Sequence, residues 1–355
     1  MPGPLAKAIE KFPRVRLGHA PTPLDAAPRL GAALGIELWI KRDDCTGLAM
    51  GGNKVRQLEF PLGEAQSRDA DTLLITSAVQ SNYVRVAAAA GRQLGMETHI
   101  QLEERVPGVD ALYRSSGNVL LDRLFGAKLH SFPVGDDEPA ADASLDLLAQ
   151  SLAEEGRRPY VIHLAPAHPP LGALGYVIAA EETLKQARNL DLAFDAVVCP
   201  TGSALTHAGL LVGLSALDLK VPVYGICVRR DAGSQAARVR QVAEQLAAMI
   251  ERPEEFDADD VMAFDGVLAP GYGQLNDAVR EAVALAARQE GLLLDPVYTG
   301  KTMAGLIEHV RSGVIPAGSR VLFIHTGGLP ALFAYGDKLG SWLSDVPWET
   351  TDLDR

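Results

Sequence analysis

The chain has 355 residues, of which 47% are hydrophobic and 22% are charged, and its formal net charge at pH 7 is −12. This length exceeds the usual limit of one hydrophobic core, so we expect one large or two moderate domains of an ordinary soluble globular protein. The negative charge argues against nucleic acid and anionic membranes as partners, because both would repel it.

Cysteine usage and the N-terminus indicate the cellular setting. Cys45, Cys199 and Cys227 are widely spaced and form neither a metal-ligand pattern nor an even disulfide framework. The first 20 residues lack an apolar signal-peptide core, and no stretch reaches the apolar length of a membrane span. We therefore expect no metal site and a reducing, cytoplasmic location.

The first half of the chain alternates short apolar runs with amphipathic ones. A helix begins at Val55, and Pro61 is expected to kink it. Strands are predicted over 37–41, 72–76, 98–102, 128–132 and 160–164, and further helices over 27–34, 83–94, 111–124 and 140–155.

In the second half the units are longer and more regular. Helices are predicted over 174–187, 206–217, 234–250, 275–290 and 301–312, and strands over 196–199, 223–228 and 321–325. Strands that alternate with helices this often predict parallel sheets covered on both faces. Two such blocks fit a two-domain α/β protein whose site lies in the cleft between them.

Lys54 lies where the glycine-rich turn 47–53 meets the helix that continues from Val55. A lysine there can direct its amine into a cleft, and the amides of the helix N-terminus would disfavour protonation. An amine with a lowered pKa is what Schiff-base chemistry needs. On this stretch alone, a surface lysine after a flexible turn is the other interpretation.

A second glycine turn, Pro200-Thr201-Gly202-Ser203-Ala204-Leu205-Thr206, follows a predicted strand and opens a helix. Its backbone amides, with the hydroxyls of Thr201, Ser203 and Thr206, suit a phosphate group. Ordinary N-capping of the helix by Ser203 or Thr206 would explain the same residues. The chain has neither a G-x-G-x-x-G nor a Walker pattern, so dinucleotide and P-loop sites lose their best support.

Polar residues mark two more turns. Ser81 and Asn82 open a predicted helix, where simple N-capping would also explain them. His325-Thr326-Gly327-Gly328 ends a strand at the edge of the sheet where ligands sit in α/β proteins. One lysine, one phosphate-type turn and these polar strand ends are the parts that a phosphorylated aldehyde cofactor requires.

Together these stretches resemble the pyridoxal-phosphate (PLP) enzymes of the tryptophan-synthase-β fold, or fold type II. Within that fold the chain is similar to the branch of D-cysteine desulfhydrases, L-cysteate sulfo-lyases and 1-aminocyclopropane-1-carboxylate (ACC) deaminases, above all to the desulfhydrases. The segments that carry the resemblance span nearly the whole chain: Ile40-Lys41-Arg42-Asp43-Asp44, Gly51-Gly52-Asn53-Lys54, Gln80-Ser81-Asn82, 171–176, 206–210, 269–273, 294–301 and 322–335.

The resemblance implies a two-domain α/β architecture and a set of cofactor residues. A large PLP-binding domain would comprise 1–55 and 171–355, with a small α/β domain of 56–170 inserted in it. Lys54, beside Asn53, would hold the cofactor, and Asn82 would bond its ring hydroxyl. The phosphate would lie in the turn formed by Thr201, Gly202, Ser203, Ala204, Leu205 and Thr206.

The resemblance also implies residues that contact the substrate. Ser81, with Gln80 and the amide of Asn82, would hold the substrate carboxylate. Tyr272 and Tyr298 would face the substrate, although core tyrosines that cap a loop are the alternative interpretation.

Two threonines distinguish the branches. Thr326 would lie beside the pyridine nitrogen with Thr299 nearby, where the deaminases typically carry leucine and glutamate. A carboxylate there would keep the ring nitrogen protonated and strengthen the ring as an electron sink, whereas a hydroxyl does not stabilise that charge. This difference favours the desulfhydrase-like branch.

Several positions depart from the family pattern and affect the substrate region. Tyr83 replaces a histidine that is common among desulfhydrases, and Val86-Ala87 replaces polar residues. Leu205 replaces a small residue of the phosphate turn, Pro61 lies in a helix usually free of proline, and Ala167-His168-Pro169-Pro170 replaces a glycine-rich segment. His168 is either a substrate-side residue or an exposed loop histidine.

The reaction that the resemblance implies is α,β-elimination from a small amino acid, D-cysteine being the best candidate. Lys54 would remove the α-proton, the β-substituent would leave with help from Tyr298 or Tyr272, and pyruvate and ammonia would form. The alternatives are L-cysteate sulfo-lyase, ACC deaminase, a biosynthetic β-replacement enzyme and a catalytically silent binding protein. We expect a homodimer, and we expect the tail with Trp342 and Trp348 to pack on the body or on a partner subunit.

Overall fold

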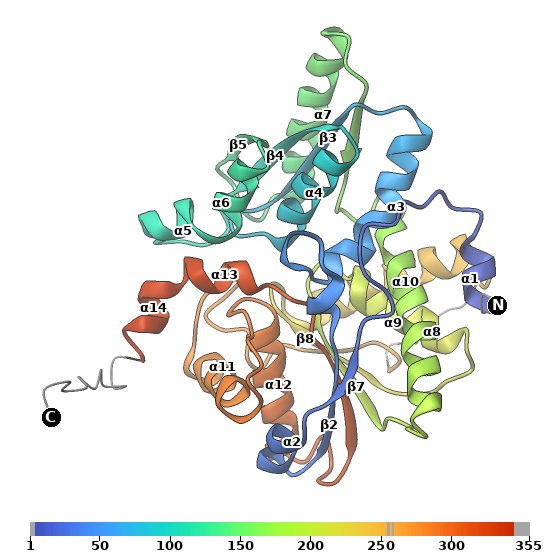
Figure 1. The fold of residues 1–355 in the computed structure, drawn as a ribbon, viewed down its shortest axis with the longest axis vertical. Helices are drawn as coiled ribbons and strands as arrows, with labels where there is room; N and C mark the ends of the chain where they lie inside the picture. The colour runs from blue at the N-terminus through green and yellow to red at the C-terminus, as the bar shows by residue number, and fades with distance from the viewer. Residues whose placement is uncertain (1–3, 254–255, 258, 344–355) are drawn as a thin grey trace, which may run out of the picture.

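The computed structural model describes residues 4–253, 256–257 and 259–343. Figure 1 shows two lobes, each built around its own sheet. The upper lobe contains segments from the first half of the chain, and the lower lobe combines the N-terminal strands with the C-terminal half. The segments of the lower lobe are therefore far apart in sequence and adjacent in space.

The sheet of the lower lobe has six strands in the order β1-β2-β10-β7-β8-β9. β1 is antiparallel to β2, and the other pairs are parallel. The strands are β1 (Leu24–Ala26), β2 (Glu37–Lys41), β7 (Ala196–Thr201), β8 (Val223–Cys227), β9 (Met262–Phe264) and β10 (Arg320–Ile324).

Alternate side chains of these strands enter two separate cores, because successive residues of a strand point to opposite faces. Val197 and Cys199 of β7 pack with the helices on one face, and Ala196 and Val198 pack with those on the other. The first face is covered by α1 (Pro4–Ile9), α8 (Leu174–Asn189), α9 (Leu205–Ser215) and α10 (Ala232–Met249). The second is covered by α2 (Pro28–Leu34), α11 (Asp277–Glu290) and α12 (Thr299–Arg311).

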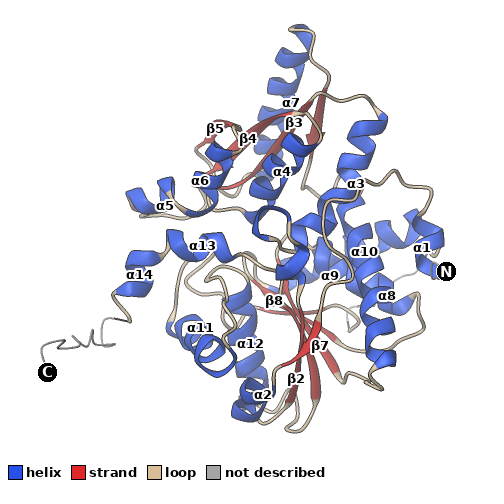
Figure 2. Cartoon of the chain, viewed as in Figure 1, coloured by secondary structure: helices blue, strands red, loops and turns tan. Residues whose placement is uncertain are grey.

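The sheet of the upper lobe has four parallel strands in the order β5-β4-β3-β6. They are β3 (Thr72–Ala78), β4 (Glu97–Glu103), β5 (Lys128–Phe132) and β6 (Pro159–Ile162). Leu73 and Ile75 of β3 pack against α3 (Asn53–Ser67) and α4 (Asn82–Gln93), whereas Leu74 faces α7 (Glu138–Glu154). Helices thus lie on both faces of each sheet, as Figure 2 shows.

Short elements complete the fold. The glycine turn before Lys54 contains two 3₁₀ helices, η1 (Asp43–Thr46) and η2 (Leu48–Met50), and a third, η3 (Leu171–Ala173), precedes α8. The remaining helices are α5 (Ala111–Ser115), α6 (Gly117–Leu124), α13 (Leu329–Ala334) and α14 (Gly336–Gly340).

The structure corrects one predicted helix and refines the ends of others. The helix expected over 111–124 is in fact α5 and α6, because Ser116 is extended and Gly117 has a φ of 59°. Pro61, where a kink was expected, lies inside α3, and the helix continues to Ser67. The sequence also left β1, β9, α1, α13 and α14 unpredicted; each of them has six residues or fewer.

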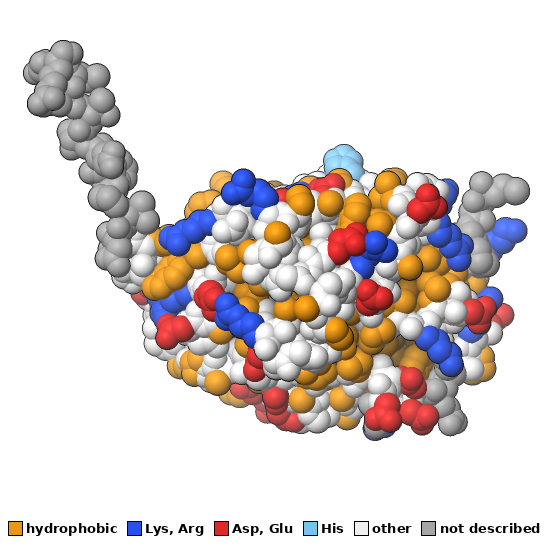
Figure 3. Space-filling model, turned by 90° about the horizontal axis from the view of Figure 1, so that it is seen from below, with side chains coloured by type: hydrophobic (Ala, Val, Ile, Leu, Met, Phe, Trp, Pro, Cys, Tyr) orange, Lys and Arg blue, Asp and Glu red, His pale blue; other side chains and the backbone are white. Residues whose placement is uncertain are grey.

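Charges of both signs are interspersed with apolar side chains on the face seen in Figure 3. No helix within the described residues is long and apolar enough to span a membrane. Among the same residues, no group of three His, Cys, Asp or Glu side chains is placed to hold a metal ion.

Candidate functional site

Lys54 is the second residue of α3, directly after the glycine turn. Its amine donates a hydrogen bond of 2.8 Å to Oε1 of Gln57 and lies 5.0 Å from the centre of the Tyr83 ring. Within the described part of the chain no carboxylate is hydrogen-bonded to it, and burial lowers its pKa to about 8. The neutral form of this amine is therefore more accessible near neutral pH than that of an exposed lysine, which the interpretation as a surface lysine does not predict.

A small cavity of about 30 Å³ brings the predicted site residues together. Residues from five segments surround it: the start of α3, the start of α4, the turn after β7, the turn before α12 and the turn after β10. They are Asn53, Lys54, Asn82, Pro200, Gly202, Ser203, Ala204, Thr206, Tyr298 and Thr326. The cavity lies between polar ends of parallel strands, where ligands bind in open α/β sheets.

The turn after β7 fits a phosphate group. α9 begins at Leu205 without a side-chain cap, so its first amides have no intrahelical partner. Ala204 holds a left-handed φ of 78° at the N-cap position. The hydroxyl of Thr206 accepts 2.9 Å hydrogen bonds from Asn53 Nδ2 and Gln57 Nε2 rather than capping the helix. Ordinary N-capping by Ser203 or Thr206 therefore does not explain this turn.

Two residues predicted at the phosphate lie outside the wall of the small cavity. Thr201 accepts a hydrogen bond of 2.8 Å from Gln235 Nε2 through its buried hydroxyl. The side chain of Leu205 lines a larger neighbouring cavity instead. For both residues, we therefore expect only the backbone, and not the side chain, to contact the phosphate.

The orientation of Asn82 follows from its neighbours. Its Oδ1 accepts hydrogen bonds from Arg85 Nη1 at 2.9 Å and from Asn118 Nδ2 at 3.2 Å. Because the carbonyl side of the carboxamide is occupied, its NH₂ group is the side left to donate to a ligand. This arrangement suits a donor to the ring hydroxyl of the cofactor.

Arg85 is a fully buried cation beside this carboxamide. Besides Asn82 it donates to Asn118 Oδ1 at 2.9 Å and to the carbonyl of Gly51 at 2.8 Å, and all three acceptors are neutral. Burial lowers its pKa to about 10, and burial raises the pKa of the neighbouring Asp122 to about 8.

Ser81 and Gln80 differ in what they can offer a substrate. Ser81 is the N-cap of α4, where its Oγ accepts from the Tyr83 amide at 3.1 Å. Its hydroxyl hydrogen has no acceptor among the described residues and can bond a carboxylate. The carboxamide of Gln80 instead bonds Ser116 O at 3.0 Å and the Asn118 amide at 2.9 Å, so its contacts are within the protein.

Tyr272 and Tyr298 form a hydroxyl pair. Their oxygens are 2.7 Å apart, and Tyr298 lines the small cavity. Burial raises the pKa of both phenols, so each carries its proton. Arg105 lies 6.0 Å above the Tyr272 ring.

The two threonines occupy different positions. Thr326 lines the cavity, whereas Thr299 is fully buried and donates its hydroxyl to Asp295 Oδ1 at 2.7 Å. Asp295 also accepts from the amides of Val297 and Tyr298, both at 2.9 Å. Its carboxylate is therefore engaged by the chain, and the residues that line the cavity include no acidic side chain.

A larger cavity of about 670 Å³ adjoins the site and shares Ser203 with it. Tyr83, which replaces the histidine common among desulfhydrases, lines this cavity, and its ring also contacts the Lys54 amine. His168 also lines it and stacks on His163 with ring centres 3.9 Å apart. His168 therefore lies away from the small cavity that contains Lys54.

Sequence reasoning missed Gln57, Arg85, Asn118 and Asp295. Gln57 and Arg85 each follow a predicted site residue by three positions, so helical spacing could have placed them beside Lys54 and Asn82. Asn118 reaches the site through a contact with Asn82 that is distant in sequence, and Asp295 bonds Thr299 within its own turn. Trp342 is partly exposed, and Trp348 lies outside the described residues.

Residues 15–327 match the family model described as "Pyridoxal-phosphate dependent enzyme". D-cysteine desulfhydrases of Salmonella choleraesuis (strain SC-B67) and Salmonella typhi are each 43% identical to this chain over 327 residues, which are 92% of this chain and 97% of theirs. A solved structure described as an ACC deaminase homologue is 34% identical with a TM-score of 0.85, over 96% of this chain and 99% of that one.

The fold is shared more widely. A fungal L-serine ammonia-lyase from Rhizomucor miehei has a TM-score of 0.63 at 20% identity, over 93% of this chain and 100% of that one. The expected type II fold with parallel sheets and helices is confirmed. Because the family model spans nearly all of the chain, the protein belongs to the pyridoxal-phosphate dependent enzymes and uses that cofactor.

Proposed function

We propose that the protein catalyses α,β-elimination from D-cysteine, with water consumed and pyruvate, ammonia and hydrogen sulfide formed. The observation that carries this proposal is the cavity where Lys54, Asn82, Tyr298 and Thr326 meet without an acidic side chain. The names of the 43% identical relatives support the choice of D-cysteine. When bound, PLP supplies the electron sink that stabilises negative charge at the substrate α-carbon.

Lys54 is the residue we assign to covalent binding of the cofactor and to removal of the α-proton. Its amine has no carboxylate partner among the residues that the structure describes, and its lowered pKa of about 8 makes the neutral, proton-accepting form accessible. The bond to Gln57 fixes the direction of the amine, since Gln57 is itself anchored to Thr206 at 2.9 Å.

Ser81 would bind the substrate, and Asn82 would bind the cofactor ring. The free hydroxyl hydrogen of Ser81 suits the substrate carboxylate, and the free NH₂ of Asn82 suits the ring hydroxyl. Tyr298 would donate to the departing sulfur, and Tyr272 could resupply that proton through the 2.7 Å contact. Both phenols carry the proton that this step needs, because burial raises their pKa.

The absence of an acidic side chain beside Thr326 among the described residues of the cavity wall supports elimination over ACC cleavage. A carboxylate near the pyridine nitrogen would keep that nitrogen protonated, whereas the hydroxyl of Thr326 would not. Asp295 is the carboxylate of the segment 294–301, yet four donors from the chain already engage it.

We further infer the assembly and the setting. The division into a large domain, 1–55 and 171–355, and a small domain, 56–170, is supported by the two separate sheets. The helices α6 and α13 pack on one another and expose three large apolar side chains, Leu120, Leu124 and Phe333. These side chains support a homodimer. The three cysteines are all free thiols, in agreement with a cytoplasmic location.

The test is a pyruvate-release screen of the PLP-loaded protein with both enantiomers of cysteine, cysteate and β-chloroalanine, and with ACC. We expect D-cysteine and β-chloro-D-alanine to yield pyruvate, and ACC to yield no 2-oxobutanoate. Faster release from L-cysteate would assign the protein to the sulfo-lyases. If none of the amino acids reacts while PLP is bound, the proposed function is wrong.

A further inference from the structure

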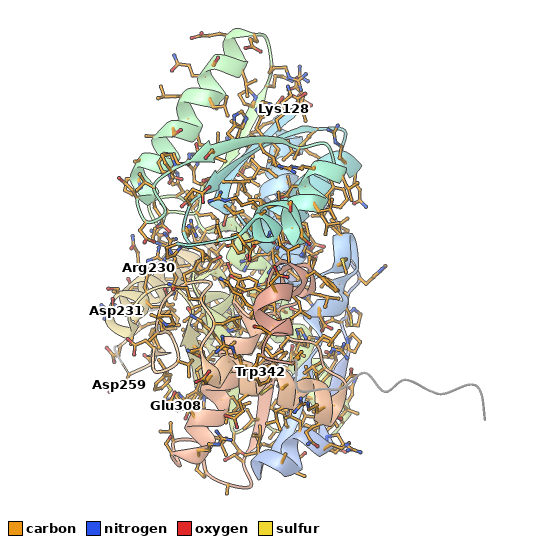
Figure 4. The ribbon with its side chains drawn as sticks, turned by 90° about the vertical axis from the view of Figure 1, so that its left-hand side faces the viewer. Lys128, Arg230, Asp231, Asp259, Glu308 and Trp342 are labelled. Atoms are coloured by element: carbon orange, nitrogen blue, oxygen red, sulfur yellow. The ribbon has the colours of Figure 1, made fainter. Side chains whose placement is uncertain are left out.

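A cluster of three arginines joins the two lobes next to the phosphate turn. Glu138, the first residue of α7 in the upper lobe, accepts hydrogen bonds from three residues of the lower lobe. Its Oε1 receives Arg229 Nη1 and Arg230 Nη2, both at 2.6 Å, and its Oε2 receives Arg238 Nη1 at 2.8 Å. Figure 4 labels Arg230 close to the level where the lobes meet.

Two of these arginines also bond the phosphate turn itself. Arg230 Nη1 donates to the carbonyl of Gly202 at 3.1 Å, and Arg238 Nε donates to the carbonyl of Ser203 at 3.3 Å. In a planar trans peptide the N–H of the next residue points opposite to the carbonyl. The amides of Ser203 and Ala204 therefore point away from the arginines, and these two residues line the cavity with Lys54.

The charges in this cluster do not balance. Three guanidinium groups face Glu138, and Asp136, which also lies near Arg229, is 86% exposed in its side chain and thus screened by water. The side chains of Arg229 and Arg238 are only 8% exposed. About two positive charges remain beside the turn, and a buried excess of charge is unfavourable until an anion neutralises it.

The acid–base behaviour of the cluster agrees with an excess of positive charge. Burial, followed by the neighbouring guanidinium of Arg238, lowers the pKa of Arg230 to about 10. Burial alone would raise the pKa of Glu138, but the arginines outweigh it and lower that pKa to about 2. Glu138 is therefore ionised throughout the physiological range.

We propose that Arg230 and Arg238 are positioning residues for the cofactor phosphate, which they support through the Gly202 and Ser203 carbonyls and through their charge, and that Glu138 orients them from the other lobe. The proposal goes beyond the assignment of D-cysteine and rests only on binding of PLP at this turn. The phosphate dianion would neutralise the charge that Glu138 leaves unpaired.

The first test compares PLP with pyridoxal, which has the same ring and aldehyde but no phosphate. In Arg238→Gln apo-protein we expect PLP affinity to fall about ten-fold or more, since the substitution removes one positive charge that attracts the phosphate dianion at this partly buried turn. Pyridoxal affinity should stay within about two-fold, because its binding does not use the turn. The PLP affinity of Arg238→Lys, which keeps the charge but loses the planar guanidinium, should lie between those of the wild type and Arg238→Gln.

Arg280→Gln is the matched control, since Arg280 forms a pair with Asp277, whose side chain is 98% exposed. The ³¹P resonance of bound PLP should shift in Arg238→Gln and not in Arg280→Gln. Equal losses for PLP and pyridoxal, or no loss of either, would overturn the proposal. If the wild type itself binds pyridoxal as tightly as PLP, the assignment of the turn to phosphate is wrong as well.

Glu138→Gln separates orientation from charge. This substitution makes the cluster more positive, so an effect of charge alone would tighten PLP binding. If Glu138 orients the arginines, PLP affinity should fall instead, by less than in Arg238→Gln, with pyridoxal affinity unchanged. Tighter binding of PLP by Glu138→Gln would refute the orienting role.

Discussion

At the scale of single residues, the account depends on the protonation of Lys54. The amine must be neutral to attack the cofactor aldehyde, and a lowered pKa means that this form gains population as pH rises through about 8. We expect the rate at which apo-protein binds PLP covalently to increase with pH around a midpoint near 8. The measurement is stopped-flow absorbance, with a free lysine derivative, whose pKa is about 10.4, as reference.

A midpoint near that of the free lysine derivative would contradict the proposed environment of Lys54. Reduction with borohydride and peptide mapping should then locate the label. A label on any other lysine would show that the assignment of this residue is wrong.

The hydroxyl of Ser81 provides a second test at this scale. If it bonds the substrate carboxylate, Ser81→Ala should raise KM about 10- to 100-fold, because a hydrogen bond to a charged group contributes about 1.5–3 kcal/mol. The kcat should change less. Because Ser81 also caps α4, thermal unfolding of the variant must be followed, and a cap loss of about 1 kcal/mol is expected.

Ser115→Ala is the matched control, since that hydroxyl is exposed and, among the described residues, bonds only the carbonyl of Ala111. A kcat that falls as much as kcat/KM, with KM unchanged, would argue that Ser81 acts in the chemical step rather than in carboxylate binding.

At the scale of elements, a buried ionic network fixes the base of α3. Arg56 donates to Asp43 at 3.0 Å and to Glu182 of α8 at 2.7 Å, and Lys41 of β2 donates to the same Glu182 at 2.6 Å. This network joins β2, η1, α3 and α8, and its Arg56 lies two residues after Lys54 in α3. It therefore anchors the N-terminal turn of α3 that contains Lys54.

Loss of one partner would leave buried charges unmatched. We expect Arg56→Ala to lower the free energy of unfolding by about 3–5 kcal/mol. The measurement is urea unfolding of the apo-protein, followed by circular dichroism. The control Arg280→Ala removes a pair whose Asp277 side chain is 98% exposed, and should cost about 1 kcal/mol or less. A similarly small cost for Arg56→Ala would mean that the network is not structural.

The sequence predicted elements wherever periodicity was strong and long. The helices that become α8, α10 and α11 and the buried strands β3, β7 and β10 were all expected, with ends that differ by a few residues. The helix over 111–124 was wrong, since apolar spacing continues through Ser116 and Gly117 while the backbone turns there to meet Gln80. A tertiary contact decided that break, and local periodicity does not contain it.

The site was predictable only in part for the same reason. Lys54, Asn82 and the turn at Gly202 stand out as turn residues at strand and helix ends. Arg238 and Glu138 are 100 positions apart, and only the meeting of the lobes brings them together. Asp295 lies in the segment 294–301 that carries the resemblance, but its hydrogen bond to Thr299 follows from the folded turn.

At the scale of the whole molecule, the exposed apolar side chains of α6 and α13 predict a dimer. Leu124 is 70% exposed and Phe333 is 58% exposed, although both belong to helices that pack closely. We expect light scattering to give twice the 37.8 kDa of the chain, and Leu124→Asp to shift the mass towards the monomer. A wild-type mass of one chain would refute the dimer.

The central claim is that Lys54 drives elimination of sulfide from D-cysteine, and one comparison tests it most directly. Pyruvate and sulfide should be released in equal amounts from D-cysteine by the PLP-loaded wild type, and Lys54→Ala loaded with PLP should be slower by several orders of magnitude. A wild type that binds PLP and yields neither product from D-cysteine, or a Lys54→Ala variant that retains the wild-type rate, would contradict the account.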